Sequence, residues 1–130
     1  MLDERLIYEM IKKIPPELAV WYPTWPQSFQ KITSTCSVGC WRIADDSIAI
    51  STSSHHEYAT KVKIEISTWS ATPEKRMALN MAINDVFGEV FFRQSCAQLA
   101  ENLPGNMKAF RSIMIYTGVV NTRTNVVLMP

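Results

Sequence analysis

The chain has 130 residues, 47% of them hydrophobic and 19% charged, a balance that is typical of one globular domain and excludes a disordered one. Its 13 basic and 12 acidic residues give a formal net charge of +1, which does not favour binding to nucleic acid or to a membrane surface. No apolar run approaches the roughly 20 residues that span a bilayer, the first residues are too acidic for a signal peptide, and three cysteines do not make a disulfide framework. We therefore expect a single domain, residues 1–130, that is assembled in a cytoplasm.

The N-terminal segment predicts a helix from Asp3 to Ile14, because its apolar residues recur at the three- and four-residue spacing of one helical face. The Pro-Pro pair at positions 15 and 16 ends it, since proline cannot donate a backbone hydrogen bond. The next segment, "ELAVWYPTWPQSFQ", contains two more prolines and predicts an extended loop. Trp21 and Trp25 in this loop would rest either on the chain's own core or on a neighbouring subunit, and the sequence leaves both open.

Several strands are expected in the middle of the chain. "SVGCWRIA", residues 37–44, is strand-like, "DDS" at positions 45–47 predicts a turn, and "IAIS" predicts a short second strand. The clearest strand runs from Tyr58 to Trp69, and its side chains alternate between two faces. One face carries Tyr58, Thr60, Val62, Ile64, Ile66 and Thr68, and the other carries Ala59, Lys61, Lys63, Glu65, Ser67 and Trp69. The alternation predicts an antiparallel sheet with one buried face and one face that is wet or covered by a partner.

A second helix is predicted from Thr72 to Gly88, with threonine as its N-cap, proline in the first helical position and glycine at its end. Its expected packing face consists of Leu79, Ala82, Ile83, Val86 and Phe87. A shorter helix is predicted from about Ser95 to Leu103. The segments "RSIMIYTGVV" and "NVVLM", joined by "NTRT", predict a C-terminal β-hairpin.

The first strand of this hairpin is largely apolar at both parities, so we expect helices to cover one of its faces and another subunit the other. The predicted fold is therefore α/β, of the α+β kind. It has a mainly antiparallel β-sheet, helices packed on one face and a closing C-terminal β-hairpin.

Cysteine and histidine residues offer one candidate for chemistry. Cys36 and Cys40 have a spacing compatible with zinc, and His55 and His56 could supply a second ligand pair. On a strand, however, the two cysteines would lie roughly 13 Å apart, and adjacent histidines would point to opposite faces. We therefore interpret the cysteines as small buried apolar groups and the histidines as the entrance to a strand, with Glu57 as the only local partner for proton transfer.

Two further patterns are weaker. Lys61 and Lys63 with Trp69 could form a basic and aromatic face for nucleic acid, but Glu65 shares their parity, so a solvated Lys/Glu face is the favoured interpretation. The methionines at positions 77 and 81 have helical spacing and are expected in the core or at an interface. No nucleotide-binding loop or hydrolase motif is present, so the sequence predicts neither an enzyme nor a cofactor.

Three segments carry a resemblance to the tail-terminator, or tail-completion, proteins of long-tailed bacteriophages. They are "ATKVKIEISTWSATPEKRMALNMAINDVF", the closing "RSIMIYTGVVNTRTNVVLM", and the N-terminal amphipathic helix followed by "WYPTWPQ". The likeness does not extend to the segment from Phe91 to Phe110.

This resemblance implies a virion structural protein in the tail or neck. It would form a ring, usually a hexamer, that caps the head-proximal end of the tail tube, ends tube polymerisation and joins the tail to the head. The implied partners are further copies of the chain, the tail-tube protein and a head-completion or connector protein, with no membrane and no specific nucleic acid, although DNA would pass through the lumen. The residues expected at its interfaces are Trp21, Trp25, Trp69, Tyr116 and Arg123.

Two alternatives remain open at this point. One is a neck or head-completion adaptor, which shares the virion context but stacks on a different partner. The other is a small metal-dependent or enzymatic domain that uses His55 and His56.

Overall fold

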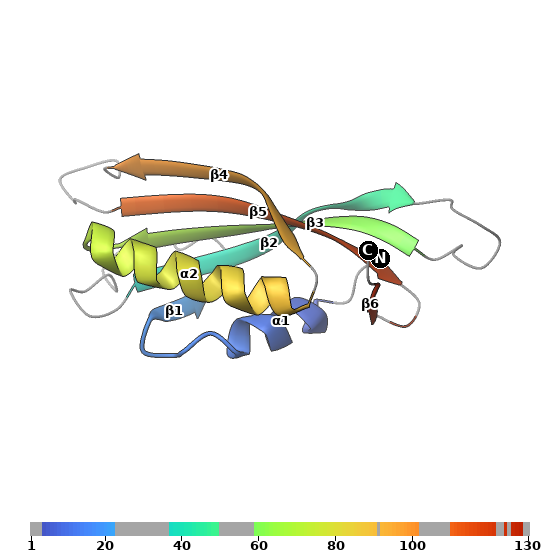
Figure 1. The fold of residues 1–130 in the computed structure, drawn as a ribbon, viewed down its shortest axis with the longest axis horizontal. Coiled ribbons are helices and arrows are strands. Elements are labelled where there is room, and N and C mark those ends of the chain that lie inside the picture. The colour runs from blue at the N-terminus through green and yellow to red at the C-terminus, as the bar shows by residue number, and fades with distance from the viewer. Residues whose placement is uncertain are drawn as a thin grey trace.

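The alternating segment in the middle of the chain forms the central strand β3, Ala59–Ser70. It pairs antiparallel with β2, Ser37–Ala49, on one side and with β5, Phe110–Asn121, on the other. The structure is a computed structural model and describes residues 4–22, 37–49, 59–90, 92–101, 110–121, 124 and 126–128. In these ranges the chain forms one six-stranded sheet and two helices, so the predicted α+β fold is confirmed (Figure 1).

Three shorter strands complete the sheet. The strand β1, Ala19–Tyr22, adds parallel to β2, while β4, Arg93–Glu101, and β6, Val126–Leu128, both add antiparallel to β5. The order across the sheet is β1-β2-β3-β5-β4, and β6 pairs with the C-terminal end of β5. Because β5 lies antiparallel between β3 and β4, those two strands run in the same direction, and the helix between them crosses over β5 as a split β-α-β unit.

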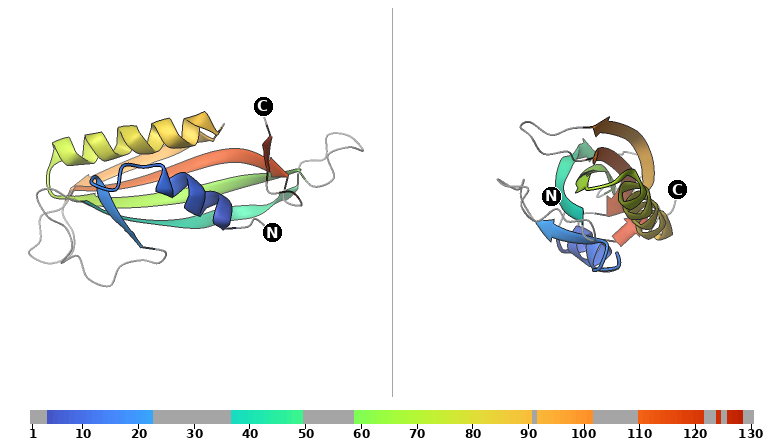
Figure 2. Two further views of the ribbon diagram at one scale, coloured as in Figure 1. Left: turned by 90° about the horizontal axis from the view of Figure 1, so that it is seen from below. Right: turned by 90° about the vertical axis from the view of Figure 1, so that its left-hand side faces the viewer.

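The two helices form where the sequence predicts them. The helix α1 spans Arg5–Lys12, and α2 spans Pro73–Glu89. The Thr72 hydroxyl caps α2 by accepting a hydrogen bond from the backbone N–H of Lys75 at 3.1 Å, as expected from the Thr-Pro start of this helix. Both helices lie on the same side of the twisted sheet, with α2 running along the strands (Figures 1 and 2).

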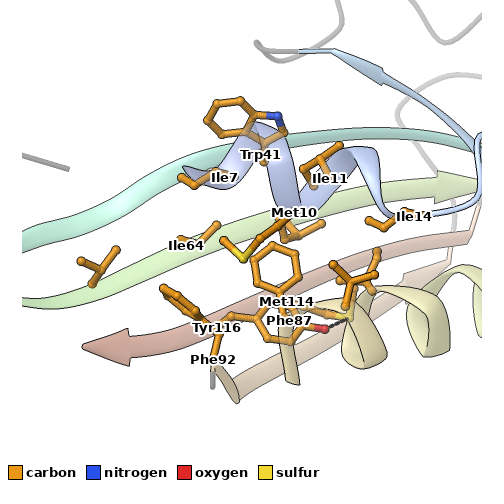
Figure 3. Close-up of a cluster of buried hydrophobic side chains, with 14 of the residues drawn as sticks. Ile7, Met10, Ile11, Ile14, Trp41, Ile64, Phe87, Phe92, Met114 and Tyr116 are labelled. Atoms are coloured by element: carbon orange, nitrogen blue, oxygen red, sulfur yellow. Dashed lines mark hydrogen bonds between the residues drawn. The ribbon is translucent and has the colours of Figure 1, made fainter. Parts of the chain in front are cut away.

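The main core lies between these helices and the sheet (Figure 3). From β3 and β5 it receives the side chains of one parity, which are fully or almost fully buried: Val62, Ile64, Ile66, Met114, Tyr116 and Val120. From the helices it receives Ile7, Met10, Ile11, Leu79, Ile83, Val86 and Phe87. The predicted packing faces of both helices are therefore confirmed, with Ala82 only half-buried at the margin of the core.

Three local predictions are wrong. The segment predicted as a helix from Ser95 to Leu103 belongs largely to the strand β4, because β5 offers it an edge with eight paired positions. The turn predicted at positions 45–47 is absent, and β2 continues through it with register shifts that absorb the polar residues. The segment after α1, predicted as an extended loop, contains the short strand β1.

Candidate interaction site

Two of the residues predicted at interfaces lie in the interior. Trp69 is fully buried beside Val38 and Cys40 on the sheet face opposite the helices, and the guanidinium of Arg111 lies 5.4 Å from the centre of its ring. Tyr116 is 1% exposed. Both side chains therefore stabilise the protomer and are not available to a partner in this conformation.

The surroundings of Tyr116 explain its burial. Its ring stacks on Phe87 with the centroids 4.7 Å apart (Figure 3). Its hydroxyl donates a hydrogen bond to Asn84 on α2. Burial raises the pKa of Tyr116 above its ordinary value, so the phenol stays protonated. One turn earlier in α2, the amide of Asn80 donates to the Ser112 hydroxyl at 3.0 Å, and these two polar contacts fix α2 on β5.

The remaining predicted residues are placed differently. Trp21 is half-buried, and its ring lies so close to Gly39 that a Cβ on that glycine would come within 2.5 Å of it. Trp21 therefore packs on the chain's own sheet, and a further contact of its exposed part with a neighbouring subunit stays a prediction. Trp25 and Arg123 lie outside the described residues, and their interface role stays a prediction.

The cysteine and histidine candidates are only partly described. Cys40 is buried against Val38 and Trp69, as expected of a small apolar group, and burial raises the pKa of its thiol to about 11, with the Glu65 carboxylate adding to the shift. Within the described ranges no three His, Cys, Asp or Glu side chains gather into a metal-binding group. Cys36, His55, His56 and Glu57 lie outside these ranges, so the metal-dependent alternative stays a prediction.

One surface that a partner could cover is the sheet face that carries no helix. We call it the open face and define it by Arg42, Lys61, Lys63, Glu65, Arg93, Ile113, Ile115, Thr117 and Val119. Its apolar members on β5 are half-buried, whereas their neighbours of the other parity are fully buried under the helices. Two of them stand directly opposite charged side chains of β3, Val119 opposite Lys61 and Ile115 opposite Glu65. The alternation predicted for β3 is thus confirmed from Lys61 to Ile66. It is wrong at Ala59, which is buried, and beyond Ile66, where Ser67 and Trp69 of the second parity are buried as well.

A second surface lies on the side of α2 that faces away from the sheet. We call it the outer face of α2 and define it by Glu74, Met77, Ala78, Met81, Asp85 and Glu89, all of which are exposed. Met77 is 65% exposed and Met81 60%, and the two methionines lie one helical turn apart. With Pro73, Glu74 and Ala78 they line a shallow hollow of about 310 Å³. Of the two locations expected for these methionines, core or interface, the core is excluded.

The sequence contains a signal for each surface. For α2, the methionines at positions 77 and 81 fall outside the predicted packing face. For the open face, the apolar second parity of β5 is visible in "RSIMIYTGVV". Each surface combines apolar side chains with charged neighbours, which suits association with another macromolecule.

No helix in the described ranges is long and apolar enough to cross a membrane. Comparison of the chain with models of known protein families gives no match, and comparison with curated proteins gives none either.

Proposed function

We propose that the protein is a phage virion structural protein that forms a ring, usually a hexamer, on the head-proximal end of the tail tube. The ring ends tube polymerisation and joins the tail to the head. The observation that carries this proposal is the pair of apolar surfaces on opposite sides of one protomer, the open face and the outer face of α2.

Two different surfaces matter because of symmetry. A protomer with a single self-complementary patch closes as a dimer, whereas a ring larger than a dimer needs two different patches that meet head to tail. Apolar side chains that are exposed or only half-buried on a small protomer also lower its solubility, so their presence on two sides favours a protein that is covered in its working state. The protomer therefore has the kind of surface that a ring subunit requires.

The order of elements supports the same proposal. The segments that carry the resemblance to tail terminators are α1, the passage from β3 into α2 through "STWSATPEK", and the closing pair of β5 and β6. In the fold these segments supply the central strand, both helices and one sheet neighbour, so the resemblance involves the framework of the domain and not a peripheral insertion.

The experiment that tests the proposal is an elongation assay. Tail-tube protein from the phage whose genome encodes this chain is polymerised from short seeds, and light scattering follows tube growth with and without the purified protein. We expect substoichiometric amounts to stop growth, because one ring per tube is sufficient. Tube growth unaffected at molar excess, together with no binding of the protein to tubes, would contradict the proposal.

The same assay distinguishes a tail terminator from a neck adaptor, the alternative role in the virion. A tail terminator binds tube ends directly, whereas a neck adaptor binds the head connector and leaves isolated tubes growing. Binding to the connector alone would therefore replace the tail-terminator role by the adaptor role.

A further inference from the structure

We propose that the outer face of α2 of one protomer docks on the open face of the sheet of the next copy. This inference rests on the proposed ring and identifies the two surfaces that build it. It commits to a second copy of this chain as the occupant of both surfaces.

The first argument is apolar complementarity. Met77 and Met81 are flexible side chains that project from α2 with more than half of their surface exposed. The open face offers Ile113, Ile115 and Val119 in a row along β5, all half-buried in the protomer. Methionine adapts its shape to an irregular apolar surface, so a methionine pair laid on a row of branched side chains would bury both sets.

The second argument is charge complementarity. Around its methionines, the outer face of α2 carries three exposed carboxylates, those of Glu74, Asp85 and Glu89, and no lysine or arginine. The bases of α2 lie elsewhere, since the guanidinium of Arg76 is directed to the Phe110 ring at 5.5 Å and Lys75 is half-buried.

The open face has the opposite balance. Among the side chains that the structure describes, its bases are Arg42, Lys61, Lys63 and Arg93, and its carboxylate Glu65 forms an ion pair with Arg42. A second carboxylate, Asp45, lies beside this face and stands opposite Lys63 in the register. An acidic helix face and a basic sheet face attract each other, whereas two helix faces or two sheet faces would place like charges together. The charges therefore favour a head-to-tail contact between different surfaces.

Geometry and size add two expectations. The helices cover one side of the sheet and the open face is the other, so the two docking surfaces point away from each other (Figure 2). A rotation of about 60° per protomer would close six copies into a ring. The helix α2 has 17 residues and is therefore about 25 Å long, which makes the contact smaller than a standard interface of about 800 Å² per partner. We therefore expect weak, concentration-dependent association in solution and tighter assembly where a tube end presents several copies together.

Reversal of charge on each surface tests the docking. The sheet variant carries Lys61→Glu and Lys63→Glu, and the helix variant carries Glu74→Lys and Asp85→Lys. Each reverses two charges on one surface at positions outside the core. Sedimentation equilibrium at protein concentrations up to about 1 mM measures association, and far-UV circular dichroism confirms that each variant is folded.

The matched control carries Glu9→Lys and Glu17→Lys. These two exposed carboxylates lie off both surfaces, and the control changes the net charge by the same amount as the helix variant. If the helix variant does not fold, Met77→Lys with Met81→Lys blocks the same surface by a different route.

We expect the wild type and the control to associate alike, and the association to weaken as salt shortens the Debye length from about 30 Å to about 3 Å. Each charge-reversed variant alone should associate at least about tenfold more weakly. An equimolar mixture of the two should regain association, because the acidic sheet of one variant then meets the basic helix of the other. A strictly monomeric wild type at about 1 mM, an unaffected sheet or helix variant, or a mixture that regains nothing would each overturn the inference.

The outcomes also separate this inference from the proposed function. If the variants still stop tube growth as the wild type does, the assignment of surfaces fails while the tail-terminator role stands. If the wild type associates through these surfaces but does not act on tubes, the docking stands and the proposed function fails.

Discussion

Replacement of Gly118 by alanine should destabilise the protein, because the new methyl group would displace the buried ring of Phe92. Gly118 lies on β5, opposite Val62 on the helix-covered side of the sheet. A Cβ added there would lie 2.8 Å from Cδ1 and Cε1 of the Phe92 ring and 2.9 Å from Cγ, the ring atom closest to the backbone, so the ring cannot avoid it by a small tilt. Phe92 is 1% exposed and meets Phe87 edge to face with the centroids 6.1 Å apart, so its displacement would disturb the core.

The expected cost follows from this overpacking. Insertion of a carbon into a well-packed core costs about 1–3 kcal/mol. At roughly 4 °C per kcal/mol for a domain of this size, Gly118→Ala should lower Tm by about 4–12 °C. Urea denaturation should show a lower midpoint at an unchanged slope, because the folded state stays equally compact.

The other two glycines in the described ranges provide matched controls. An added Cβ on Gly88 meets nothing within 4 Å, so Gly88→Ala should leave stability unchanged or raise it by about 0.5 kcal/mol, since alanine is the better helix former. At Gly39 the obstacle is the outer part of the half-buried Trp21 ring, which can move, so Gly39→Ala should cost less than Gly118→Ala. A Gly118→Ala protein as stable as Gly88→Ala would refute the packing described here.

Three further predictions concern the helix cap, the buried phenol and the buried thiol. Thr72→Ala removes the hydroxyl that accepts the Lys75 N–H and should cost about 1 kcal/mol in urea denaturation, whereas Thr72→Ser should cost little. Tyr116→Phe removes the hydrogen bond to Asn84 but keeps the ring, so it should lower the free energy of unfolding by about 0.5–1.5 kcal/mol. A larger loss would show that the hydroxyl does more than join α2 to β5. Because the pKa of Cys40 is raised from 9.0 to about 11, its thiolate is scarce below pH 9 and alkylation of the folded protein should accelerate only as the pH rises toward 11. Peptide-resolved mass spectrometry after iodoacetamide treatment measures this rate, and rapid labelling of folded protein at pH 8 would contradict the burial of Cys40.

The sequence predicts those elements whose pattern and end signals agree. The helix α2 has an apolar packing face, the Thr-Pro start and a glycine near its end, and the central strand β3 alternates without interruption. Both are found within two residues of their predicted bounds. The C-terminal hairpin and the N-terminal helix are likewise found where their patterns place them.

The strand β4 shows what local pattern cannot predict. Its segment "SCAQLAE" contains good helix formers at helical spacing, yet it forms a strand, because hydrogen bonds to β5 are available only in an extended conformation. Similarly, "DDS" resembles a turn, but the uninterrupted partner strand β3 keeps β2 extended through it. In both places a long-range pairing overrides the local preference.

The sequence predicts the surface residues less well than the fold. The alternation of a strand shows which face a side chain lies on, but it does not show whether that face is covered. Trp69 shares the parity of Lys61, and parity alone predicts a wet or partner-covered side chain. Burial of Trp69 depends on Val38 and Cys40, which only the pairing of β2 with β3 brings beside it. For Met77 and Met81, the sequence shows that they lie off the packing face of α2, but only the fold shows that no other described element covers them.

Direct imaging of tube ends tests the central claim most directly. Tail tubes grown from seeds in the presence of the protein, and then examined by cryo-electron microscopy, should carry a ring of this chain at one end only, with no copies along the tube wall. Tubes grown without the protein should have bare ends and continue to lengthen. A protein that decorates the tube wall, binds both ends alike or is absent from the tubes would contradict the account.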